Sequence, residues 1–149
     1  MARYYPVSPL FWSDKKVIKW DERTRYLSLY LLTSEHRNLE GLFRLPLAYI
    51  QADLDWSSDE VSDHMSDLTS DGFVNYDGGA KVVFLPKALK YHQPKAPKQI
   101  AGAINVLQQV PPTVLWPDFM AAAKAYAPEF HAALVPLSQG DSVELEETA

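Results

Sequence analysis

Lysine side chains interleaved with one tyrosine are the residues of this sequence whose chemistry is most readily named. Residues 81–98 carry five lysines and no carboxylate. A lysine ammonium group neutralises a phosphate, and a neighbouring aromatic ring stacks on an exposed base. We therefore predict a contact with DNA, mainly with its phosphate backbone, by the residues Lys81, Lys87, Lys90, Tyr91, Lys95 and Lys98.

A second basic group lies closer to the N-terminus, where acidic residues dilute it. Its members are Lys15, Lys16, Lys19, Arg23 and Arg25, with Asp14, Asp21 and Glu22 among them. Runs of charge are common on ordinary protein surfaces. A second interpretation therefore stays open for both basic groups, that they are ordinary solvent-exposed surface. The net charge of -5 does not decide between the two, because local fields determine where a polyanion docks.

The segment before the lysine run has the opposite charge. Residues 57–80 hold six Asp and Glu and no Lys or Arg. Ser57 and Glu60 match a capping box, and apolar residues recur at helical spacing from Val61. A helix is therefore predicted over residues 57–71, with an acidic outer face.

That acidic face is unsuited to DNA, because carboxylates repel phosphates. We expect it to bind a protein partner, through Asp59, Asp63 and Asp67. His64 is adjacent in sequence but lies about 100° around the helix from Asp63. A hard cation needs several convergent oxygens, so no metal site is predicted here.

Motifs for catalysis and cofactor binding are missing from the sequence. It contains no Walker-type glycine loop, Gly-x-Ser-x-Gly elbow or HExxH pair. Without cysteine, it has no disulfides or thiolate metal sites. We expect a binding module rather than an enzyme, with no cofactor. No apolar run approaches the ~18 residues of a membrane span, and residues 1–6 lack the apolar stretch of a secretory signal. A cytoplasmic location without membrane contact is predicted.

The predicted order of elements positions these groups. A helix that is apolar nearly all round is predicted at 24–33, a strand at 41–45 and a helix at 46–54. After the acidic helix, the β-rich runs 73–76 and 81–85 flank an aspartate–glycine turn typical of a hairpin. Helix, strand, helix, helix, strand, strand is the order of a winged helix. The predicted fold class is α+β, a winged helix-turn-helix with a C-terminal helical extension.

The rest of the chain divides into two parts. Residues 94–128 contain two helical patterns with narrow apolar stripes, predicted to pack on the first domain or on a partner chain. Residues 129–149 are small and acidic and are predicted to be a largely disordered tail. The predicted domains are thus a winged helix over 1–93, a helical extension over 94–128 and this tail.

Five short segments spread over residues 11–110 occur in a recognisable order and spacing. They are Phe11-Trp12-Ser13-Asp14, Tyr30-Leu31-Leu32-Thr33-Ser34, Gly41-Leu42-Phe43-Arg44-Leu45-Pro46 with Tyr49-Ile50, Asp71-Gly72-Phe73-Val74, and Leu89-Lys90-Tyr91-His92-Gln93. Together they resemble the N-terminal domain of phage and prophage replication-initiation proteins, the replisome-organiser group related to DnaD-like primosome proteins.

The resemblance implies a winged-helix DNA-binding protein that acts in phage-type initiation of DNA replication. Its implied partners are DNA and either replication proteins or a second copy of the chain, as a homodimer. Two other functions stay open at this point. The acidic helix favours a winged helix used only for protein–protein contact, and a small transcriptional regulator has the same order of elements.

Overall fold

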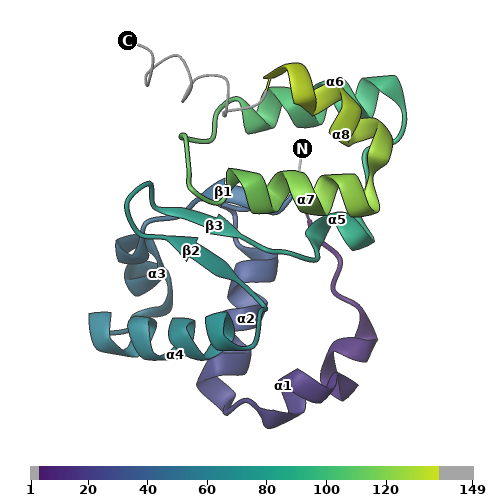
Figure 1. Cartoon of the computed structure of the whole chain (residues 1–149). Helices are drawn as coiled ribbons and strands as arrows, with labels where there is room; N and C mark the ends of the chain where they lie inside the picture. The colour runs from purple at the N-terminus through teal and green to yellow at the C-terminus, as the bar shows by residue number, and fades with distance from the viewer. Residues whose placement is uncertain (1–3, 138–149) are drawn as a thin grey trace.

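The computed structural model describes residues 4–137 and has an α+β fold built on a small antiparallel sheet (Figure 1). The sheet has the order β1-β3-β2, and its strands are β1 (Leu42–Arg44), β2 (Asn75–Asp77) and β3 (Val82–Phe84). Phe84 of the central strand pairs with Leu42 on one side and with Asn75 on the other. The predicted α+β class is therefore confirmed.

Helices from the first part of the chain lie on one side of this sheet, with α2, α3 and α4 nearer to it than α1 (Figure 1). They are η1 (Pro9–Ser13), α1 (Lys15–Lys19), α2 (Glu22–Thr33), α3 (Leu47–Leu54) and α4 (Ser58–Ser70). Side-chain caps fix where they begin: Asp21 accepts the Thr24 N–H at 2.8 Å, and Ser57 and Glu60 form the predicted capping box of α4. Such caps satisfy backbone N–H groups that have no partner within a helix.

Glycine and asparagine shape the turn that enters β1. Gly41 has a φ of +81°, in the left-handed region that disfavours a side chain. The buried Asn38 holds this turn, since its Oδ1 accepts the N–H groups of Gly41 and Leu42 and its amide donates to the Leu42 carbonyl at 2.7 Å. β1 is thereby aligned for pairing with β3.

The predicted hairpin is confirmed, although Asp77 belongs to a strand rather than to the turn. Its Oδ1 accepts the N–H groups of Gly79 and Ala80 at 3.0 and 3.2 Å. An aspartate in this position closes a turn by replacing a backbone acceptor. Its other oxygen, Oδ2, accepts from the Thr113 hydroxyl at 2.6 Å. One carboxylate therefore both shapes the hairpin and ties it to the loop before the last helices.

The opposite face of the sheet carries the second group of helices (Figure 1). They are α5 (Ala88–Tyr91), α6 (Pro97–Leu107), α7 (Trp116–Tyr126), α8 (Pro128–Leu134) and η2 (Val135–Leu137). Proline lies in the first turn of α6, α7 and α8, where its missing N–H leaves no hydrogen bond unmade. None of the helices within residues 4–137 has the length and apolar character needed to span a bilayer.

Helix α8 corrects the predicted boundary at residue 128. The prediction of disorder was wrong for residues 129–137, which form α8 and η2. Pro128 begins a helix instead of closing one, and Phe130 and Leu134 are buried against the α7 side of the core. Burial of these two side chains holds the segment in place despite its small and polar neighbours. The remainder of the predicted tail, 138–149, lies outside the described residues.

Two apolar clusters lie on the two faces of the sheet, because successive strand residues point to opposite sides. Phe43 and Val83 belong to the cluster formed with α1–α4, to which Ala88 of α5 also contributes. Leu42, Val82 and Phe84 belong to the cluster formed with α5–α8. The three-stranded sheet is thus an inner layer between two helical layers.

Candidate nucleic-acid interface

Four of the five predicted DNA-binding lysines lie near one another in the chain, on α5 and at the start of α6. Lys87 precedes α5, Lys90 lies within it, and Lys95 and Lys98 flank the beginning of α6. All four side chains are exposed. None makes an ion pair with another residue in the range 4–137. Their charges are therefore not neutralised by the described part of the chain.

Tyr91 extends from the end of the same short helix. Its side chain is 69% exposed, and the Lys90 Nζ lies 5.8 Å from the centre of its ring. The helix is anchored to the core, because its residues Ala88 and Leu89 are buried. A cation beside an exposed ring supplies both a phosphate contact and a stacking surface.

Lys81 is separated from these residues by the whole of β3. It lies at the hairpin end of the strand with a φ of +60°, and its carbonyl accepts the Leu45 N–H at 2.7 Å. The four extended steps from Lys81 to Leu85 span about 13 Å. The predicted set is therefore divided between the hairpin tip and the other end of the sheet.

Two shallow clefts adjoin the lysine segment. One, of about 390 Å³, lies between residues 93–95 and the α7–α8 junction, and both Lys95 and Glu129 line it. The other, of about 520 Å³, is lined by Glu40, His92 and Gln99 among others. Burial raises the pKa of the Glu40 carboxyl. A carboxyl-bearing side chain therefore lines each cleft.

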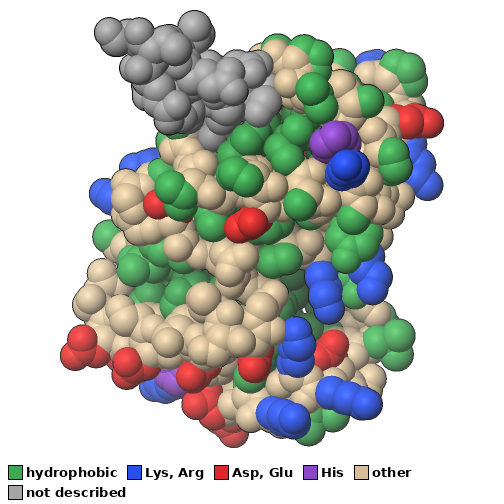
Figure 2. Space-filling view, in the orientation of Figure 1, with side chains coloured by type: hydrophobic (Ala, Val, Ile, Leu, Met, Phe, Trp, Pro, Cys, Tyr) green, Lys and Arg blue, Asp and Glu red, His purple; other side chains and the backbone are tan. Residues whose placement is uncertain are grey.

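The predicted protein-binding residues lie on the outer side of α4. Asp59, Asp63 and Asp67 are all exposed. Figure 2 shows acidic side chains along the edge that α4 forms, and most of the basic ones on a different side. Glu60 is the member of this helix that pairs with a cation, since its Oε2 lies 2.7 Å from Arg23 Nη1 on α2.

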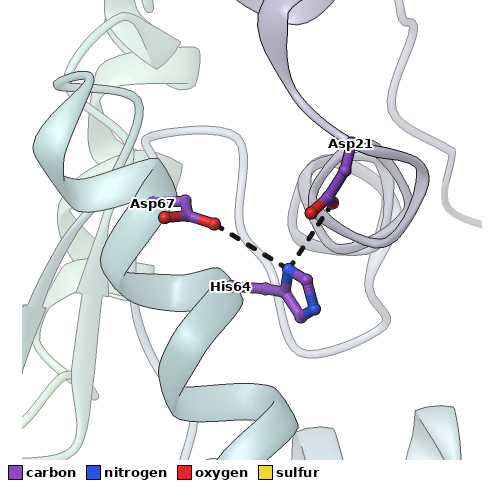
Figure 3. A group of neighbouring side chains, drawn as sticks. All are labelled: Asp21, His64 and Asp67. Atoms are coloured by element: carbon purple, nitrogen blue, oxygen red, sulfur yellow. Dashed lines mark ion pairs between the residues drawn. The ribbon is translucent and has the colours of Figure 1, made fainter.

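His64 connects α4 to α2 through a polar cluster (Figure 3). Its Nδ1 lies 2.8 Å from the Thr24 hydroxyl, 3.6 Å from Asp21 Oδ1 and 4.0 Å from Asp67 Oδ2. Thr24 is buried, whereas both carboxylates are mostly exposed. The hydrogen bond from the Thr24 N–H is the main cause that lowers the pKa of Asp21. The cluster thus joins the first turn of α2 to the middle of α4.

Asp21, His64 and Asp67 are also the residues of the described chain whose types and spacing would suit a cation. One ligand atom from each lies within 4.8 Å of the others. However, His64 Nδ1 already contacts the Thr24 hydroxyl, and Asp21 Oδ1 already accepts the Thr24 N–H. A metal would have to replace these bonds, so the contacts present favour a structural role at the α2–α4 junction.

Sequence reasoning placed Asp21 among the acidic residues that dilute the N-terminal basic group, and it missed the position of Asp21 beside His64. The two residues are far apart in the chain, and no local pattern links them.

Sequence reasoning also separated the N-terminal lysines from the 81–98 segment. In the structure, Lys16 Nζ donates to the Asp71 carbonyl at the end of α4. This bond holds α1 beside the chain that leads into β2.

No protein-family model, curated protein or solved structure matches this chain. Its function is therefore argued from its own residues.

Proposed function

We propose that this chain is a winged-helix DNA-binding protein that acts in phage-type initiation of DNA replication. The observation that carries the DNA-binding part is the group of exposed, unpaired lysines beside Tyr91 on α5 and at the start of α6. The winged-helix part is supported by the order α2, β1, α3, α4, β2, β3 and by the sheet order β1-β3-β2. The role in replication rests on the sequence resemblance described above.

The proposed mode of binding departs from that of a standard helix-turn-helix. There the second helix of the pair enters the major groove and reads base edges with Arg, Lys, Asn or Gln. Here that helix is α4, whose exposed face carries Asp59, Asp63 and Asp67. Each close carboxylate–phosphate pair costs about 1 kcal/mol even in water. The DNA therefore contacts the lysines through its backbone, with little reading of sequence.

Fluorescence anisotropy with a labelled DNA at several salt concentrations tests this proposal. Replacing Lys87, Lys90 and Lys95 together by Glu should abolish binding, and replacing them by Gln should reduce the salt slope on duplex DNA by about 2.7. Lys124→Glu, on exposed α7 surface, is the matched control and should bind as the unchanged protein does. Lys81→Glu measures the contribution of the hairpin tip. Absence of binding at low salt, or binding untouched by the triple variants, refutes the proposal.

A second function is favoured by one observation, the exposed carboxylates of Asp59, Asp63 and Asp67 on α4. A winged helix used for protein contact would present this surface to a basic partner, because opposite charges steer association. The test is a binding measurement against a purified replicative helicase or helicase loader encoded near the gene. A complex lost when Asp59, Asp63 and Asp67 become Asn, and kept in the Lys87/Lys90/Lys95 variant, supports this function. The reverse pattern, or no complex, counts against it.

A further inference from the structure

The N-terminal lysines and the α5 lysines share one side of the molecule. Figure 2 shows Lys and Arg side chains from α1 upward to the level of α5. Both helices contribute to the same apolar cluster, α1 through Val17 and α5 through Ala88. The fold thus joins basic residues that are some seventy positions apart in sequence.

Contacts within the molecule determine which of the N-terminal cations are free. Arg25 is engaged, because its guanidinium donates to the Val17 and Ile18 carbonyls at 3.0 and 2.9 Å. Arg23 pairs with Glu60, and Lys16 donates to the Asp71 carbonyl at 2.6 Å. Lys15 and Lys19 are exposed and make no ion pair with a residue between 4 and 137.

An exposed tryptophan accompanies these two lysines. Trp12 is 61% exposed, and its ring meets that of Phe11 edge to face at 5.0 Å. Phe11 in turn packs against the first apolar cluster. The indole is therefore held by an anchored neighbour while most of its surface faces solvent. Trp12 and Tyr91 are thus two exposed aromatic residues, each close in sequence to two exposed lysines that make no ion pair within residues 4–137.

The neighbouring acidic group does not cancel this charge. Asp14 directly precedes Lys15 in the chain, and its Oδ1 accepts the N–H groups of Lys16 and Val17 at 2.8 and 3.4 Å. Its charge is thus directed at the first turn of α1, where a carboxylate is stabilised by the helix N-terminus. The Lys15 and Lys19 side chains therefore keep their positive charges exposed to solvent.

We propose that these residues form one binding surface for single-stranded DNA, which we name the α1–α5 surface. Its members are Trp12, Lys15, Lys19, Lys87, Lys90 and Tyr91. This inference rests on the proposed DNA-binding function and specifies its substrate class. Lysines hold the backbone, and the two rings stack on bases, which a single strand exposes and a duplex does not.

The lengths of the helices also favour a single strand. α1 has five residues and α5 has four, so they are about 7.5 and 6 Å long. Neither is long enough to lie along a major groove as a recognition helix does. Short, separate basic elements suit a flexible strand that passes from one to the other.

The experiment compares a labelled oligothymidylate of about 16 nucleotides with a duplex of the same length, by fluorescence anisotropy. The oligothymidylate should bind more tightly. Trp12→Ala and Tyr91→Ala should each weaken its binding by about 5- to 100-fold. Tyr26→Ala, which removes a ring that is 56% exposed on α2, is the matched control and should have no effect. Lys15→Gln with Lys19→Gln should reduce the salt slope on the single strand by about 1.4.

Any of the following results overturns the inference. Equal affinity for duplex and single strand does so, as does unchanged binding of the oligothymidylate by Trp12→Ala. Competition by polyglutamate as effective as that by unlabelled oligothymidylate of equal charge would indicate a surface for any polyanion. If the Lys87/Lys90/Lys95 variants lose duplex binding while the Trp12 and Lys15/Lys19 variants bind normally, the inference fails and the proposed function stands. If no DNA binds at low salt, both fail.

Discussion

Replacement of Gly41 by alanine is the most direct test of how the sheet and α5 are joined. A Cβ at position 41 would lie 2.4 Å from the Ala88 Cβ and 3.1 Å from the Leu85 carbonyl oxygen. The φ of +81° adds a cost of about 1–2 kcal/mol for any L-residue. Overpacking of a buried contact adds about 1–3 kcal/mol more. Gly41→Ala should therefore lower the free energy of unfolding by about 2–5 kcal/mol.

Urea denaturation monitored by tryptophan fluorescence measures this change. Gly78→Ala is the matched control, since a Cβ there meets nothing within 4 Å. The double variant Gly41→Ala/Ala88→Gly removes the close contact and leaves the backbone cost. The free energy of unfolding of the double variant should exceed, by about 1 kcal/mol or more, the value expected from adding the two single effects. If Gly41→Ala is as stable as Gly78→Ala, or if the double variant shows no coupling, the packing of α5 on this turn is not as described.

Two further predictions concern the second helical layer. The hydrogen bond from the Thr113 hydroxyl is the main cause that lowers the pKa of Asp77. This carboxylate therefore stabilises the fold above about pH 4, and its contribution is lost as the pH falls through the lowered pKa. In urea titrations from pH 6 to about pH 2, Asp77→Asn should weaken the acid dependence of stability. Phe130 is fully buried on α8. Phe130→Ala should destabilise the protein by about 3–5 kcal/mol in the same denaturation assay, and a loss below 1 kcal/mol would show that α8 is not part of the core.

The elements that sequence predicted well are those with local chemical signals. The capping box of Ser57 and Glu60 lies within one helical turn, so its residues are sufficient to place the start of α4. Gly72, just after that helix, has a φ of +75°, the left-handed conformation in which a glycine commonly ends a helix. The hairpin was likewise specified by its own turn residues. In each case the interacting groups are only a few positions apart.

The predictions that were wrong depend on contacts between residues that are far apart in the sequence. α8 was missed because the small and acidic composition of residues 129–149 was interpreted as disorder, whereas the burial of Phe130 among distant side chains holds the segment as a helix. α2 was predicted to be buried nearly all round, yet Tyr26 is 56% exposed. Lys81 and Lys87 were grouped because they are close in sequence, but they lie at opposite ends of β3. The DNA-binding, protein-binding and replication roles stay predictions.

The shared central strand has a consequence for how this chain folds as it is made. β3 gives Val83 to one apolar cluster and Val82 and Phe84 to the other, so both clusters depend on the same three residues. Synthesis proceeds at about 5–20 residues per second, so Phe119 of α7, whose ring meets that of Phe84, follows Phe84 by about 2–7 seconds. During that interval one face of the sheet has no cover, and its apolar side chains are open to a chaperone or to another nascent chain. A truncation before α7 would make that interval permanent, and we expect such a fragment to aggregate.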